Sequence, residues 1–194
     1  MQEADALREL AMMLLKDIRM MTLFVLLLIA AAIDLRTYRI PNWLTGLGAA
    51  AALAFSVGVP PSAPHGIWWA LQGCGLALLI MLPLYALRAM GAGDAKLMAV
   101  AGLYLGPFAT LVAILACMIV GGLLALAYSV LRGSFNRLMQ NLRNAAWQGA
   151  ASIMTRQSLR LAPDASSSIG RLPFAVSIAL GTTGTVLVRH FGFY

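Results

Sequence analysis

Two aspartates lie in stretches of the sequence where a charge is unexpected. Asp34 ends the run "MTLFVLLLIAAAID", and Asp94 follows "RAMGAG" at the start of another apolar run. The other five acids belong to the polar first twenty residues or, as Asp164, to a long polar stretch. A carboxylate at the edge of hydrocarbon is costly, and such residues commonly face a bundle interior and carry function. Asp34 and Asp94 are therefore the first candidates for chemistry.

Two carboxylates at one site form an acid and a base together. Both cannot easily ionise, so one keeps a proton and the pair titrates as a unit. The charged member can take a proton from water, which attacks a carbonyl, while the protonated member donates to the carbonyl oxygen and later to the leaving nitrogen. Gly91 and Gly93, on either side of Ala92, let the backbone bend and let a substrate strand come close. This chemistry is peptide hydrolysis.

A purely structural interpretation stands beside this one. A single acid near the end of a membrane span often reaches out to water or pairs with a nearby base. Arg36 follows Asp34 and Lys96 follows Asp94 by two residues, but residues two apart on a helix do not face each other. The pattern Gly-x-Gly-Asp is short enough to recur by chance. Two such acids at matched depth favour a functional interpretation more than either aspartate alone would.

The composition predicts the kind of scaffold that positions these acids. Of 194 residues, 61% are hydrophobic and 11% are charged, about half the charged fraction of a soluble domain. We therefore expect an all-α integral membrane bundle with about six transmembrane helices. The net charge of +7 is typical of cytoplasmic loops that face anionic lipid, so no nucleic-acid partner is expected. Cys74 and Cys117 are far apart and form no C-x-x-C pair, so no metal or cofactor is expected.

Six apolar stretches are long enough to be read as spans. They cover about Met20–Tyr38, Trp43–Val59, Ile67–Leu87, Met90–Leu105, Phe108–Leu131 and Leu172–Val188. If the loops after the first, third and fifth spans are cytoplasmic, they hold ten of the 14 Lys and Arg residues. The positive-inside rule then places both termini outside and both Asp34 and Asp94 near the cytoplasmic boundary at similar depth.

The predicted organisation is a polar N-terminal segment, 1–19, followed by one membrane domain, 20–194. Within that domain, 132–171 is expected to be a cytoplasmic loop with an amphipathic helix on the inner leaflet. One alternative for the first span stays open. Its apolar core with basic residues before it could be a cleaved signal peptide, although the acidic leading stretch is unlike a signal sequence. Oligomeric state is left open.

Three stretches of the sequence resemble a known family. "DLRTYRIPNWLT" around Asp34 and "GAGDAKLMAVAGLYLG" around Asp94 are similar to the type IV prepilin peptidases, membrane aspartyl proteases of the GxGD kind. "RLPFAVSIALG" resembles the family's last-span motif, with Phe174 and Ala175 where that motif usually has Tyr and Gly. The closest likeness is to the short, peptidase-only branch that serves tight-adherence (Flp-type) pili.

The resemblance implies a reaction and a site. The two catalytic aspartates would be Asp34 and Asp94, and Pro41, Asn42 and Lys96 match the family's "IPN" and "GDxK" positions with a supporting role. The substrate would be a prepilin or pseudopilin with a short basic leader, usually ending in Gly, before a hydrophobic helix. Cleavage would occur at the cytoplasmic face of the bacterial inner membrane. The cytoplasmic C-x-x-C domain of longer members, which also N-methylate the product, has no counterpart here.

Two other classes of function fit some of the residues. A small proton- or cation-coupled transporter would also place acids in a helical bundle, but such acids are expected at the membrane midplane. A non-catalytic assembly protein of a pilus or secretion machine would leave the acids as packing or lipid-contact features. Presenilin-type proteases share GxGD but have "YD" where this chain has Ile33-Asp34.

Overall fold

The structure, a computed structural model, describes residues 18–58, 66–87, 90–131, 143 and 174–190. Its elements are all helices: α2 (Ile18–Thr37), α3 (Asn42–Val57), α4 (Ile67–Ala86), α5 (Ala92–Leu131) and α7 (Phe174–His190). Within these ranges there is no strand, so the predicted all-α bundle is confirmed. The predicted amphipathic helix within 132–171 and the polar segment before Ile18 lie outside the described residues, apart from Arg143.

The apolar character of the helices is that of a membrane protein. Three helices, α2, α4 and α5, are long and apolar enough to cross a bilayer, and α3 and α7 are shorter apolar helices. Leucines and other large apolar side chains are exposed on the outer faces of these helices, where a soluble protein would carry charge. The hydrocarbon of a bilayer is the solvent in which that surface is stable.

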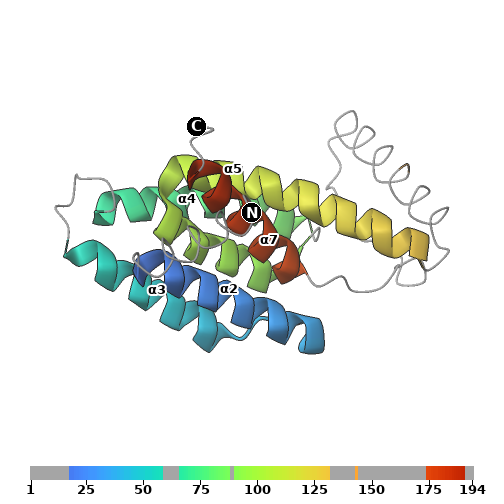
Figure 1. Ribbon diagram of the computed structural model, residues 1–194, viewed down its shortest axis with the longest axis horizontal. Helices are drawn as coiled ribbons and strands as arrows, with labels where there is room; N and C mark the ends of the chain where they lie inside the picture. Colours follow the sequence, from blue (N-terminus) through green and yellow to red (C-terminus); the bar gives the residue numbers. More distant parts are fainter. Residues whose placement is uncertain (1–17, 59–65, 88–89, 132–142, 144–173, 191–194) are drawn as a thin grey trace, which may run out of the picture.

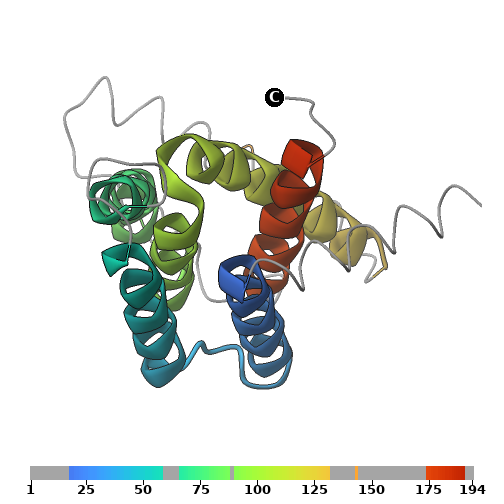
Figure 2. The same ribbon diagram turned by 60° about the vertical axis from the view of Figure 1, so that its left-hand side comes forward.

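The predicted fourth and fifth spans are the two parts of α5. Its 40 residues would measure about 60 Å if straight, twice the thickness of the hydrocarbon. The helix breaks at Gly106, whose φ of 73° and ψ of 178° are not helical, and Pro107 follows. Figure 2 shows α5 changing direction between its green first part and its yellow second part. Gly106 has a backbone conformation that favours glycine, and a Cβ there would also overlap the Trp69 ring.

Pro107 also leaves a backbone carbonyl without its helical hydrogen bond, and a charged side chain supplies the missing donor. Proline has no N–H, so the carbonyl of Leu103, four residues earlier, loses its helical partner. The Arg19 guanidinium donates a hydrogen bond to that carbonyl at 2.7 Å and lies 5.1 Å from the centre of the Trp69 ring. Arg19 is one of the four Lys and Arg residues that the predicted topology leaves outside the cytoplasmic loops. It is in fact part of α2 and only 7% exposed, although it does lie at the end of α2 away from Asp34.

Small residues let the helices pack closely. Gly73 on α4 and Gly102 on α5 face each other so tightly that a Cβ on either would overlap the other's backbone. Without a hydrophobic driving force between helices in lipid, such close backbone contact is a main source of helix association. Figure 1 shows α2 and α3 side by side, with α4, α5 and α7 packed above them.

Candidate active site

Asp34 lies one turn before the end of α2 and is 5% exposed. Its Oδ2 atom accepts a hydrogen bond of 3.0 Å from the backbone N–H of Ala175, 141 residues away in sequence. Ala175 is the second residue of α7, so its N–H has no partner within that helix. The N-terminus of a helix also carries partial positive charge, which favours a carboxylate. The first turn of α7 therefore fixes the carboxylate of Asp34.

Asp94 is the third residue of α5. Its Oδ2 atom accepts a hydrogen bond of 3.1 Å from the backbone N–H of Gly91, just before the helix. An acidic side chain at this position that reaches back to the residue before the helix is half of a capping box, and it stabilises the helix start. Asp94 thus has a structural role, and this contact uses only one of its two oxygens.

The two glycines of "GAGD" both face close neighbours. A Cβ on Gly91 would lie 3.1 Å from the Asp94 Oδ2 atom, and a Cβ on Gly93 would lie 3.2 Å from the Ile40 Cβ atom. Both distances are tighter than ordinary van der Waals contact. Gly93 therefore lets the start of α5 lie against the segment that joins α2 to α3. This packing explains the glycine at 93 without reference to a substrate.

The structure also brings two of the predicted supporting residues together. The Lys96 ammonium donates a hydrogen bond of 2.9 Å to the side-chain oxygen of Asn42. Pro41, in an extended conformation, precedes α3, and its carbonyl accepts the N–H groups of Leu44 and Thr45 at the start of that helix. The "IPN" segment after α2 and the "GDAK" segment of α5 are thus joined directly to each other.

These contacts gather the ends of three helices around two carboxylates. The end of α2 carries Asp34, the start of α5 carries Asp94, and the start of α7 holds Asp34 through its backbone. The two aspartates lie on helix ends that meet, since Gly93, next to Asp94, packs against Ile40, six residues after Asp34. Figure 2 shows the joined ends of α2 and α3 at one end of the bundle, away from the break in α5. Among the described residues, no three or more His, Cys, Asp or Glu side chains lie close enough together to hold a metal ion.

Sequence reasoning missed one contributor to this site. The N–H of Ala175 is a backbone group, and alanine has no side chain that could have drawn attention to it. The signal was the likeness of "RLPFAVSIALG" to a last-span motif, which marked this stretch without saying which atom matters. A motif that differs from its family pattern in the side chain can still supply a backbone donor.

The fold and the candidate site are those of a helical membrane protein with two aspartates at one end of its bundle. The comparison with protein families identifies the family to which the chain belongs. A sequence model of the type IV leader peptidase family matches residues 21–126, which is 106 of the 194 residues. The chain belongs to this family and is therefore a protease. The match includes both aspartates and stops before α7. Neither the curated proteins nor the solved structures include a match to this chain.

Proposed function

We propose that this chain is an aspartic endopeptidase that removes the leader of type IV or Flp-type prepilins or pseudopilins at the cytoplasmic membrane face. The observation that carries the proposal is that the end of α2, which carries Asp34, meets the start of α5, which carries Asp94, and the start of α7. An acid pair can supply both the acid and the base for hydrolysis of an amide, and the match to type IV leader peptidases supports a prepilin substrate.

The proposed mechanism uses the two carboxylates in turn. The ionised member takes a proton from a water molecule as the water oxygen bonds to the carbonyl carbon. The protonated member donates its proton to the carbonyl oxygen, which gives a neutral tetrahedral diol. When the carbon–nitrogen bond breaks, a proton passes to the leaving nitrogen and the carboxyl product forms. The Ala175 N–H holds Asp34 in place, and the Gly91 N–H holds Asp94.

The supporting contacts give Lys96 and Asn42 a positioning role in this proposal. Their hydrogen bond ties the start of α5 to the start of α3 beside the carboxylates. A small displacement of a reacting group can lower a rate by a large factor. We therefore expect these two residues to affect rate without being required for the chemistry.

The proposed orientation follows from the distribution of charge. Arg36 and Arg39 flank the end of α2 that carries Asp34, as expected for a cytoplasmic end. Both termini would then lie outside the bacterial inner membrane. Single cysteines at Pro61 and Arg143, in a protein without its two native cysteines, should be labelled from opposite sides of the membrane. Labelling of both from one side would contradict the proposed topology.

A direct assay tests the activity. The purified protein in detergent is mixed with candidate prepilins that carry a short basic leader ending in glycine before a hydrophobic segment. We expect a shortened product with a new N-terminus after the leader. An Asp34→Asn protein, prepared in parallel, serves as the inactive control. If no candidate is shortened by the wild-type protein, the proposed cleavage of prepilin leaders fails.

We also propose that the protein lacks methyltransferase activity. The resemblance is to the peptidase-only branch, and the sequence has no glycine-rich βα signature for a methyl donor. Incubation of the purified protein with labelled S-adenosylmethionine and a cleaved pilin should transfer no label. Transfer of label by the purified protein would refute this part of the proposal.

A further inference from the structure

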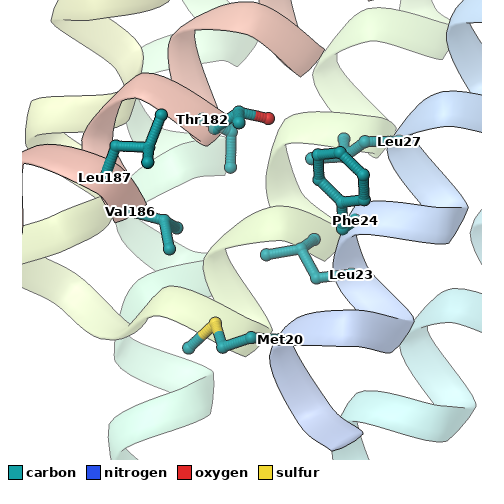
Figure 3. A pocket seen from close by; sticks show the side chains of 8 residues that line it. Met20, Leu23, Phe24, Leu27, Thr182, Val186 and Leu187 are labelled. Carbon is teal, nitrogen blue, oxygen red and sulfur yellow. The ribbon is translucent and has the colours of Figure 1, made fainter. Parts of the chain in front are cut away.

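A hollow lies between α2 and α7, away from the two aspartates. Its volume is about 90 Å³, and its wall is formed by Met20, Leu23, Phe24 and Leu27 of α2 and by Thr182, Thr183, Val186 and Leu187 of α7. Figure 3 shows the labelled side chains of the two helices on either side of it. The deeper residues are buried, while those at the rim, such as Phe24 and Val186, are partly exposed.

The position of the hollow is tied to the candidate active site. It lies between the two helices that are joined at one end by the Asp34–Ala175 hydrogen bond. Leu27 comes seven residues before Asp34 and Met20 fourteen before it, which is about 10 to 21 Å along the helix. Thr182 comes seven residues after Ala175, which is about 10 Å. Both helices therefore place the hollow at the same distance below the carboxylate.

One polar atom in the wall of the hollow, the hydroxyl oxygen of Thr182, is buried without a hydrogen-bond partner among the described residues. The Thr182 side chain is 1% exposed. In Figure 3 its oxygen lies on the side that faces α2. A buried hydroxyl without a partner is unfavourable. A lipid chain could not satisfy it, because a hydrocarbon has no acceptor or donor, whereas a peptide helix carries backbone carbonyls whose second lone pair can accept from a hydroxyl.

We propose that this hollow receives the hydrophobic helix of the substrate. The inference rests on the proposed function, since it assumes that the bond to be cut lies at Asp34 and Asp94. A substrate helix that starts at the cut bond and enters the bilayer beside α2 and α7 would bring its residues about 7 to 14 past that bond level with the hollow. The volume is below that of the engineered cavity of about 150 Å³ that holds benzene. It therefore fits one or two side chains of a helix lying along the groove.

Kinetics with a matched pair of variants test the proposal. Val186→Phe fills the hollow, and Val188→Phe makes the same change at an outward position that is 42% exposed. With the prepilin cleaved in the assay above, the first variant should raise KM by about tenfold or more, as a misfit in an apolar pocket does, and leave kcat near normal. The second should leave both unchanged. A peptide that keeps the leader and only the first few residues after the cut is too short to reach the hollow, so its cleavage should be insensitive to either change.

Two further measurements keep the test independent of how Val186→Phe folds. Thr182→Val removes the hydroxyl at nearly the same shape and should raise KM several-fold. A photoreactive benzoylphenylalanine at position 24, in lipid nanodiscs with an inactive Asp94→Asn protein, should crosslink to the prepilin about 7 to 14 residues past the leader.

The possible outcomes distinguish failure of the proposed substrate groove from failure of the proposed peptidase activity. Normal cleavage with an unchanged KM in Val186→Phe and Thr182→Val would overturn the groove assignment and leave the peptidase intact. Crosslinks from position 24 only to phospholipid, or only to residues 1–17 of the chain itself, would also overturn it. Failure of the wild-type protein to cleave any prepilin would contradict the proposed function and with it the substrate helix.

Discussion

Replacing Asp94 by Asn separates the two roles that the structure gives this residue. The carboxylate accepts the Gly91 N–H at the start of α5, and in the proposed reaction it also exchanges a proton. Asn keeps a side-chain oxygen that can accept the same hydrogen bond, but it can neither take nor give a proton. Asp94→Ala removes both functions. The pair of variants therefore measures the cap and the chemistry separately.

The expected magnitudes differ for the two variants. A lost helix cap costs about 1 kcal/mol, which lowers the melting temperature of a chain of this length by about 2–4 °C. Asp94→Ala should show this loss, and Asp94→Asn should melt within about 1 °C of the wild type because its cap is retained. Loss of a general acid or base lowers the rate by about 10²–10⁴-fold. Both variants should show that loss in leader cleavage.

The assay follows the shortened pilin on a gel, with membrane insertion and the melting curve measured on the same preparations. The double variant of Asp34→Asn and Asp94→Asn should cleave no more slowly than either single variant, because groups that act as a unit are strongly non-additive. Cleavage by the wild type should have a bell-shaped dependence on pH. Asp164→Asn, in the long polar stretch, is the matched control and should be normal.

Two results would refute this reasoning. A properly inserted Asp94→Asn protein that cleaves at the normal rate would end the aspartic-protease proposal. If Asp94→Asn were inactive but melted as low as Asp94→Ala, the loss of activity would be a consequence of a damaged helix start.

Three more predictions concern the contacts around the site and at the far end of the bundle. Lys96→Met and Asn42→Ala should each slow cleavage by less than about tenfold, and the double variant should slow it by less than the product of the two factors. The reason is that the two residues share one hydrogen bond worth about 0.5–1.5 kcal/mol. Full additivity of the two effects would show that this bond has no role. Gly106→Ala should destabilise the protein by about 1–3 kcal/mol from backbone strain alone. Its control, Gly122→Ala, has open space around the new methyl group and should be neutral or stabilising in a thermal melt. Equal melting temperatures of the two variants would contradict the break in α5 at Gly106. Arg19→Met should lower the free energy of unfolding by about 1–3 kcal/mol, because the carbonyl freed by the proline loses its donor, and an unchanged denaturation midpoint would show that the carbonyl finds another partner.

The family match bears on the alternatives left open by the sequence. A transporter or an assembly protein was compatible with two acids in a helical bundle. The match to leader peptidases over residues 21–126 favours a protease. The two acids also lie near helix ends, whereas a proton path across the membrane would need acids at the midplane.

The sequence by itself determined the candidates and the class of fold. An acid in an apolar run is so unfavourable that Asp34 and Asp94 could be chosen as candidates from their neighbours in the sequence. The run "YLGPF" likewise marked the end of one apolar helix and the start of the next, because glycine and proline act locally on the backbone. These are local effects, and the neighbours in the chain are enough to predict them.

The tertiary structure decided which groups meet. Nothing in the residues around Asp34 says that its partner is the N–H of Ala175, 141 residues later, because every residue except proline carries the same backbone donor. The same holds at the other end of the bundle. Local rules say that Pro107 frees the carbonyl of Leu103, but only the packing of α2 against α5 supplies the guanidinium of Arg19. Such pairs depend on how whole helices pack, and packing in lipid is set by shape over many residues, which no short motif encodes.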